Sequence, residues 1–239
     1  PSAAEQSHFP GPFVGENALH VLAVNRREDA ICTAIGTAVQ HLNKPQLESL
    51  FWAQCSGGFF TEQPMASYGG TVLSYCAVFC MRRAITLLLS LSIKEGNMKG
   101  VIDLNSQKHA ACVHTGYLPI HAVVANSRKN MYDFLADLPG LKPLANLRAN
   151  VRMRSARGSH SNLSPMQLAC YLGDHGMFEH VMRRYSTIVW KWGPVTQYQI
   201  DLEGIDSSGS GGNDVMELIG RIDATRATQE MLLDSFVEG

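Results

Sequence analysis

Four stretches of the sequence share a short apolar anchor, and together they decide the fold: NALHVLAVN from Asn17, TVLSYCAVF from Thr71, LPIHAVVAN from Leu118 and SPMQLACYL from Ser164. Each stretch opens a short apolar segment. A second apolar segment follows in every case, and these second segments run from Asp29 to Leu42, Arg82 to Ile93, Lys129 to Leu138 and Met177 to Arg184. The sequence therefore predicts four repeated units of two helices each.

The four stretches resemble the ankyrin-repeat signature T-P-L-H-x-A, which opens a unit of about 33 residues. The match is best from Ser164 to Ala169, whereas Leu22, Cys76 and Val123 stand at the position of the final Ala. The central apolar residues of the stretches are 54, 47 and 46 positions apart, so each unit carries a long insertion. Such insertions gather on one face, which is commonly the binding face. We expect finger loops near 43–70, 95–116 and 139–162.

The repeat pattern stops after Arg184, and the sequence TIVWKWGPVTQYQIDL over 187–202 has the composition of strands. Gly193 and Pro194 divide it, which predicts a β-hairpin that needs another surface to pack on. A flexible linker by composition follows, and helices are expected over 214–222 and 227–237. The predicted fold class is mainly α: an ankyrin-repeat solenoid with long finger loops over 1–186, then a linker region over 187–239 with the hairpin and two helices.

The charge of the chain is nearly balanced, with 20 Lys and Arg against 21 Asp and Glu. This balance argues against nucleic acid as a partner. Charged residues make up 17% of the chain, against about 25% in ordinary soluble domains, so part of the surface is expected to contact other protein. The longest nearly apolar stretch, Ala84 to Ile93, is too short to cross a bilayer, so no transmembrane segment is expected within this chain.

No motif in the sequence points to catalysis or to a bound cofactor. The six cysteines form no C-x-x-C pair, and reduced thiols are expected. The run GSGG from Gly209 lacks the Lys and the Ser or Thr of a phosphate-binding loop. His20 and His121 stand at the His position of the ankyrin anchor, where a structural role is expected. We therefore expect no enzymatic activity, no metal site and no cofactor.

The order of motifs is similar to that of the cytosolic amino-terminal region of the transient receptor potential cation channels, in the vanilloid branch. GENALH from Gly15 precedes a finger with GGFF and YGG, then LPIHAVVAN, SPMQLA and W-x-W-GPV from Trp190. In that family, similar openings mark the last four of six ankyrin repeats, and a W-x-x-GPV strand follows. The first two repeats of the family have no counterpart before Gly15. The resemblance implies a tetrameric channel with its pore beyond residue 239 and this region on the cytosolic face of the membrane.

Two groups of residues are candidate contact sites. Large aromatic side chains outside the repeat helices are frequent interface anchors. Six of them are predicted to contact neighbouring subunits of a homotetramer: Phe59, Phe60, Tyr68, Trp190, Trp192 and Tyr198. The third finger holds the candidates for an anion or lipid contact: Lys142, Arg148, Arg152, Arg154 and Arg157. Phosphoinositide head groups or nucleotide phosphates fit these charges, and the resemblance adds calmodulin as a candidate partner.

The leading interpretation is an assembly and gating module of a cation channel, in which the finger over 43–70 of one subunit packs on the hairpin over 187–202 of its neighbour. The alternative is a soluble ankyrin-repeat adaptor that binds a client protein through its finger loops. Several apolar segments of about 20 residues beyond Gly239 would favour the channel, whereas a polar terminus would favour the adaptor.

Overall fold

The computed structural model describes residues 11–62, 69–93, 96–104, 106, 109–138, 147–152, 159–200, 205–206 and 214–220. The helices are α1 (Ala18–Val24), α2 (Glu28–His41), α3 (Lys44–Trp52), α4 (Gly58–Glu62), α5 (Val72–Val78), α6 (Arg82–Ile93), α7 (Pro119–Ala125), α8 (Lys129–Ala136), α9 (Pro165–Leu172), α10 (His175–Tyr185) and α11 (Val215–Gly220). The strands are β1 (Ala149–Arg152), β2 (Ser159–Leu163), β3 (Ser186–Trp192) and β4 (Val195–Ile200). The mainly helical class that the sequence predicts is confirmed.

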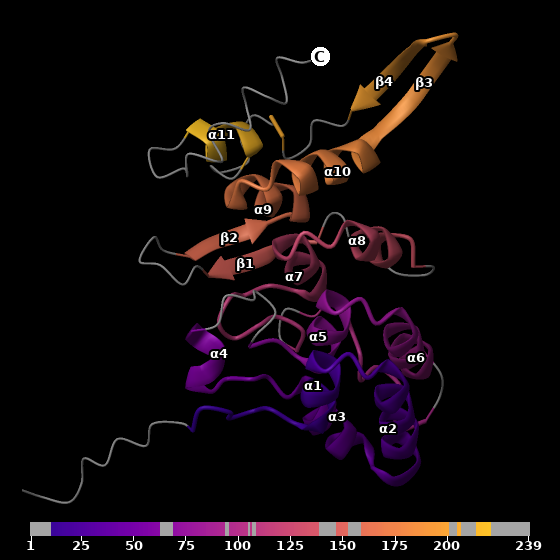
Figure 1. Ribbon diagram of the computed structural model, residues 1–239, viewed down its shortest axis with the longest axis vertical. Helices are drawn as coiled ribbons and strands as arrows, with labels where there is room; N and C mark the ends of the chain where they lie inside the picture. Colours follow the sequence, from indigo (N-terminus) through magenta and orange to yellow (C-terminus); the bar gives the residue numbers. More distant parts are fainter. Residues whose placement is uncertain are drawn as a thin grey trace, which may run out of the picture.

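Eight of the described helices form four pairs in a linear stack. Helix α1 packs against α2, α5 against α6, α7 against α8 and α9 against α10. The first helices of the pairs also contact one another in chain order, from α1 through α5 and α7 to α9. Figure 1 shows the pairs following one another along the long axis of the molecule. Because each pair contacts the pairs next to it in the sequence, the arrangement is a stack and not a closed bundle.

The turn between the two helices has the same geometry in every pair. Its first residue adopts a left-handed backbone, with φ of 55° at Arg26, 61° at Cys80, 54° at Ser127 and 70° at Gly173. The next residue donates its N–H five positions back, and the accepting carbonyls belong to Leu22, Cys76, Val123 and Ala169. These four residues are the ones that align at the last position of the sequence signature. Residues that align in the sequence signature therefore also occupy equivalent positions in the backbone structure.

The first helix of each pair also begins in the same way. Its N-cap residue has an extended backbone at Asn17, Thr71, Leu118 and Ser164. The side chain of Ser164 accepts the N–H of Gln167 at 3.2 Å, and the side chain of Gln167 accepts the N–H of Ser164 at 2.9 Å. Asn17 and His20 form the equivalent capping box in the first unit. These contacts satisfy N–H groups that a helix start leaves without a partner.

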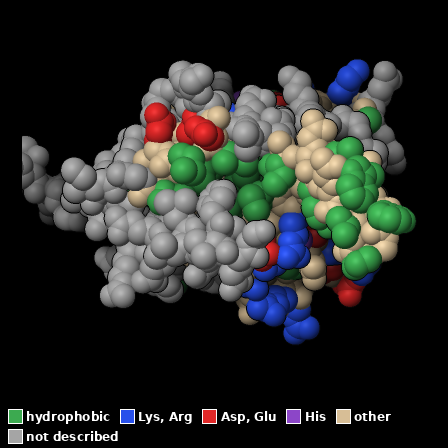
Figure 2. Space-filling view, turned by 90° about the horizontal axis from the view of Figure 1, so that it is seen from above, with side chains coloured by type: hydrophobic (Ala, Val, Ile, Leu, Met, Phe, Trp, Pro, Cys, Tyr) green, Lys and Arg blue, Asp and Glu red, His purple; other side chains and the backbone are tan. Residues whose placement is uncertain are grey.

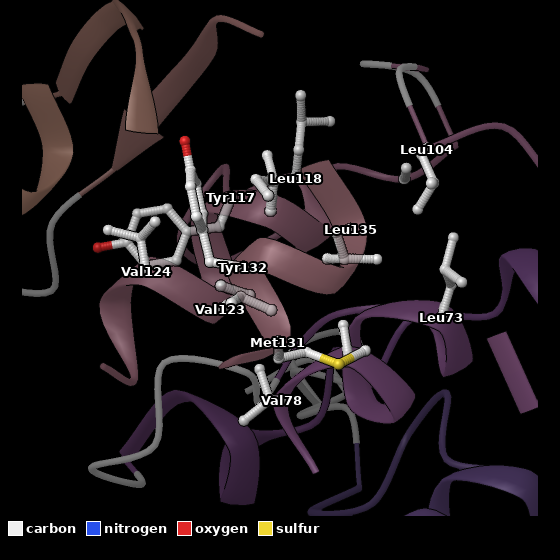
Figure 3. Packing of buried hydrophobic residues seen from close by; sticks show 14 of the residues in the cluster. Leu73, Val78, Leu104, Tyr117, Leu118, Val123, Val124, Met131, Tyr132 and Leu135 are labelled. Carbon is white, nitrogen blue, oxygen red and sulfur yellow. The ribbon is translucent and has the colours of Figure 1, made fainter. Parts of the chain in front are cut away.

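The first helices of the pairs supply the centre of the core. Every residue of α5 is buried, as are Pro119–Val124 of α7 and Pro165–Cys170 of α9. Figure 3 shows labelled side chains of this core gathered between the helices, among them Val123 and Met131. In α1, by contrast, the buried residues are Leu19, His20 and Ala23. A helix with pairs on both sides buries all its faces, whereas α1 lies at the end of the described stack.

The first finger is not a loop, because it contains α3 and α4. Asn43 caps α3: its side chain accepts the N–H of Gln46 at 3.1 Å, and the Gln46 side chain accepts the N–H of Asn43 at 3.0 Å. Leu47 and Phe51 are the buried residues of this helix. The finger expected near 43–70 therefore contains helical structure, and at α3 a capping box and an apolar pair build the helix.

The third finger contains a second hairpin, which the sequence analysis does not anticipate. Strands β1 and β2 pair antiparallel, and Ala149 and Val151 are buried while Asn150 and Arg152 are exposed. This alternation places one face of β1 on the stack. The predicted hairpin near the end of the chain is also present: β3 and β4 pair antiparallel around Gly193, which has a φ of 57°.

Helix α11 packs on α9 at the end of the stack. Val215, Leu218 and Ile219 are buried there, and the thiol of Cys170 lies 4.0 Å from the carbonyl oxygen of Val215. This helix falls within the predicted range 214–222. The helix predicted over 227–237 lies outside the described residues.

The repeated left-handed turn predicts that substitutions at two equivalent positions change the free energy of unfolding in opposite directions. Gly173 has no side chain to clash in this backbone conformation, whereas Cys80 pays a steric cost in the same one. We expect Gly173→Ala to lower the free energy of unfolding by about 1 kcal/mol and Cys80→Gly to raise it by about 1 kcal/mol. Urea unfolding of the two variants measures both changes, and equal signs would contradict the equivalence of the turns.

Candidate functional site

The β3–β4 hairpin is the most exposed apolar element among the described residues. Figure 1 shows it projecting beyond α10, and Figure 2 shows hydrophobic side chains gathered on it. Of the predicted contact residues, Trp192 is 81% exposed, and Trp190 and Tyr198 are exposed as well. Large apolar groups that protrude together in this way mark interaction surfaces.

The pairing of the strands spreads these side chains over both faces of the hairpin. One face carries Trp190, Trp192 and Val195, and the other carries Ile188, Tyr198 and Ile200. A bulge between Ile188 and Trp190 shifts the register, which puts these two side chains on opposite faces. A two-stranded ribbon with two apolar faces cannot bury both against its own chain, so a further surface is needed.

A groove separates the hairpin from the end of α10. Its volume is about 750 Å³, and it is lined by Glu179, Met182, Arg183, Ser186, Ile188, Tyr198 and Ile200. The carboxylate of Glu179 pairs with the guanidinium of Arg183 one helical turn later. The groove therefore has an apolar wall on the hairpin side and a charged rim on the helix side.

The first finger carries a second aromatic cluster. The rings of Phe13 and Phe59 lie 5.1 Å apart, and those of Phe59 and Phe60 lie 5.3 Å apart. Phe59 is 38% exposed and Phe13 is more exposed, whereas Phe60 is 2% exposed. The structure thus places Phe60 in the core of its own chain, so the exposed part of the cluster is Phe13 and Phe59. Tyr68 lies outside the described residues.

The segment before α1 holds this cluster in place. The carbonyl of Pro12 accepts the N–H of Phe59 at 3.1 Å, and the carbonyl of Val14 accepts the N–H groups of Ser56 and Gly57 at 2.9 and 3.0 Å. Phe13 was missed by the sequence analysis because it stands far from the finger along the chain, and no local pattern marks the contact.

The basic residues of the third finger are only partly described. Arg148 is half-buried and donates to the side-chain oxygen of Gln167 at 2.7 Å. Arg152 is exposed, and its guanidinium donates to the carbonyl of Val113 at 3.3 Å. Lys142, Arg154 and Arg157 lie outside the described residues. The two described side chains thus contact their own fold, and an anion or lipid contact at this finger stays a prediction.

The described residues contain no group of three or more His, Cys, Asp or Glu side chains that could hold a metal ion. The six cysteines are free, as expected from the sequence. His20 and His121 are fully buried, and the Nε2 atom of His121 lies 3.0 Å from the carbonyl oxygen of Leu163, just before the N-cap of the next unit. The buried histidine therefore links two neighbouring units, which is a structural role.

Burial of these two rings predicts how stability depends on pH. Desolvation lowers the pKa of His20 to about 4 and that of His121 to about 4, whereas an unfolded histidine titrates near 6.5. As the pH falls, the histidines of the unfolded chain therefore take up protons before those of the folded chain. The free energy of unfolding is thus highest above pH 6.5 and decreases as the pH falls from about 6.5 to 4.

We expect His121→Gln to reduce the loss of unfolding free energy between pH 7 and 5 by about 2 kcal/mol. Urea unfolding at a series of pH values measures this, and His41→Gln, which changes an exposed histidine, is the matched control. An unchanged slope in the His121 variant would show that the buried ring does not carry the acid sensitivity.

Comparison with known proteins gives relatives of one kind. The chain is 26% identical over 240 residues to the transient receptor potential cation channel subfamily V member 6 of Rattus norvegicus, an alignment that covers 86% of this chain and 28% of that protein. It is 39% identical over 61 residues to subfamily V member 6 of Homo sapiens, which covers 26% of this chain and 8% of that protein. It is 41% identical over 51 residues to subfamily V member 5 of Homo sapiens, which covers 21% of this chain and 7% of that protein.

All three relatives are cation channels by name, and none is named as an enzyme. No protein-family model matches the chain. The chain spans about 28% of the length of the rat relative, so the similarity is to one region of that protein. Within the described part of the chain, every helix is too short or too polar to cross a membrane.

Proposed function

We propose that this chain is the ankyrin-repeat and linker region of a vanilloid-type cation channel, and that it assembles subunits on the cytosolic face of the membrane. The observation that carries the proposal is the alignment with the rat channel, which runs through 86% of this chain. A similarity that runs through most of the chain is more specific than a match to one repeat would be.

The repeat geometry supports the ankyrin assignment. Four helix pairs share the same extended N-cap, the same left-handed turn residue and the same hydrogen bond five residues back. The units differ in the lengths of the segments between them, which form the fingers. A stack of two-helix units with insertions on one face is the architecture that ankyrin arrays use for protein contacts.

The two exposed apolar surfaces support the assembly role. The first surface is the hairpin, and the second is the pair Phe13 and Phe59 on the first finger. Figure 1 shows α4 and the hairpin on different sides of the stack. Two different patches on one molecule form a head-to-tail contact between copies, and such a contact closes into a ring when the rotation fits. A homotetramer in which Phe59 of one subunit packs on Trp190 and Trp192 of the next meets this requirement.

Such a joint would also connect the stack to the rest of the channel. The hairpin follows α10 directly, so a rotation of the rigid stack would move the hairpin and the neighbour that covers it. Phosphoinositide, nucleotide and calmodulin remain candidate partners of the region. In the proposed assembly they would act by shifting this joint.

The proposal is tested in the full-length gene product expressed in cells. We expect wild-type protein to form tetramers and to carry a cation current. Trp190→Ser with Trp192→Ser should reduce the tetramer fraction about tenfold, because each ring buries on the order of 150–250 Å² at the contact. Ile93→Ser, which changes an exposed apolar residue on α6, is the matched control and should leave assembly intact.

Native gel electrophoresis and patch-clamp recording give the two readouts. Unfolding free energies of the chain should change by less than about 0.5 kcal/mol in both variants, because the side chains are exposed. A protein that carries no current, stays monomeric and captures a client through its fingers would instead be the adaptor of the alternative interpretation.

A further inference from the structure

The four turns between paired helices form a row of basic residues. Because every turn has the same left-handed first residue, positions can be compared between units: Arg27 is equivalent to Arg128 and Arg82 to Lys129, whereas the second turn has the buried Met81 at the position of Arg27. The cationic residues of the first three turns are Arg26, Arg27, Arg82, Arg83, Arg128 and Lys129, and all six are exposed. We name these six residues the turn row. The fourth turn has Asp174 and His175 at the positions of Arg128 and Lys129, so the basic run ends there.

Hydrogen bonds hold neighbouring turns against each other. The carboxylate of Glu28 in the first turn accepts the N–H groups of Arg83 and Ala84 in the second, at 2.8 and 3.2 Å. The guanidinium of Arg82 donates to the carbonyl of Asn130 in the third unit at 2.9 Å. The hydroxyl of Ser127 donates to the carboxylate of Asp174 in the fourth. The turns therefore form one continuous edge of the stack.

The charges along this edge are not balanced. Three carboxylates stand among the turns, and the contacts of the fold occupy each of them. Glu28 caps α6, Asp29 pairs with Arg83 at 2.7 Å, and Asp174 accepts the N–H of Met177 at 2.9 Å.

Five cations of the turn row are left without such a partner. The ion pairs that the structure describes include none of Arg26, Arg27, Arg82, Arg128 and Lys129, although Arg82 donates to the backbone carbonyl of Asn130. This edge therefore has a local excess of positive charge, although the net charge of the whole chain is −1.

We propose that the turn row binds an extended acidic polypeptide segment. The row is narrow, with two cations in each of its three turns, which fits a single extended chain. Packed helices lie about 8–10 Å apart, and three residues of an extended chain span about 10 Å. An acidic residue at every third position would therefore meet each turn in succession. The exposed residues that stand beside these cations in the first and third turns are polar, namely Asn25, Ser127 and Asn130, whereas surfaces that bind membranes pair their cations with apolar groups.

The binding is tested with the whole 239-residue chain and a fluorescent peptide of about 18 residues that has Asp at every third position and Gly or Ser between. We expect anisotropy to show binding that weakens with added salt. Arg27→Gln, Arg128→Gln and Lys129→Gln together should weaken it about tenfold or more. The matched control replaces three exposed lysines outside the row, Lys44, Lys99 and Lys191, by Gln, and should weaken binding less than about twofold.

A second peptide with the same number of Asp residues in one block tests the register, and it should bind more weakly than the spaced peptide. Equal losses in the two triple variants would overturn the proposal, because net charge alone would then explain the binding. Failure of the spaced peptide to bind would overturn it too, as would row-dependent binding to phosphatidylserine vesicles in place of the peptide. Thermal melts of both triple variants check that the fold is kept.

Discussion

Replacing Phe60 by Ala should lower the free energy of unfolding of the chain by about 3–5 kcal/mol. The ring of Phe60 is 2% exposed, and it lies edge-on to Phe59 at 5.3 Å and to Phe13 at 6.3 Å. Its removal leaves a cavity between α4 and the segment before α1. The ring cannot be replaced by water without cost, because the surrounding residues are apolar. Urea unfolding of the purified chain measures the loss.

The adjacent residue provides the control. Phe59 is 38% exposed, so Phe59→Ala should cost less than about 1 kcal/mol in the isolated chain. In the assembled protein, the same substitution should weaken the tetramer. Equal destabilisation by the two substitutions would place both rings in the core and remove the main support for a contact at the first finger.

Gly116→Ala should have the second large effect, a loss of about 3 kcal/mol or more in unfolding free energy. Gly116 has a φ of 72°, and a Cβ atom there would lie 1.7 Å from the carbonyl oxygen of Asn150 on β1. The substitution therefore adds a steric collision to an unfavourable backbone conformation. Either the turn before α7 or the β1–β2 hairpin must move to relieve it.

A second glycine with a similar backbone conformation separates the cost of backbone strain from the cost of the steric collision. Gly100 has a φ of 70°, and a Cβ atom there would meet nothing within 4 Å. Gly100→Ala should therefore cost about 1–2 kcal/mol, from backbone strain alone. If Gly116→Ala cost no more than Gly100→Ala, the close approach of β1 to Gly116 would be refuted. Thermal and urea unfolding of the two variants decide the matter.

The four helix pairs could be predicted because their signal is local. Each anchor occupies consecutive positions, and the repeat aligns Leu22, Cys76, Val123 and Ala169 although their side chains differ. The structure shows why the difference is tolerated: the backbone carbonyl of this position accepts the hydrogen bond of the turn, and any residue supplies a carbonyl. The terminal hairpin was predictable for a similar reason, since Gly193 and Pro194 mark its turn.

The fingers were harder to predict because their structure depends on distant contacts. Strand β1 contains Arg and Asn, and its burial pattern appears only when it packs beside Gly116. Phe60 and Phe59 are adjacent and chemically identical, and both contact Phe13, yet Phe60 is buried and Phe59 is exposed, because neighbouring positions of α4 point in different directions. Helix α3 could have been found from Asn43 and Gln46, which form a capping box with Pro45 in the first turn.

The central claim is that the first finger of one subunit packs on the hairpin of the next. The most direct test is disulfide cross-linking in the full-length gene product, with Phe59→Cys and Trp190→Cys in a background in which the exposed Cys80 is replaced by Ser. On a gel without reducing agent, we predict a ladder of covalently linked chains that extends to the tetramer and requires both new cysteines. A protein that assembles into tetramers without any cross-link between these positions would contradict the account.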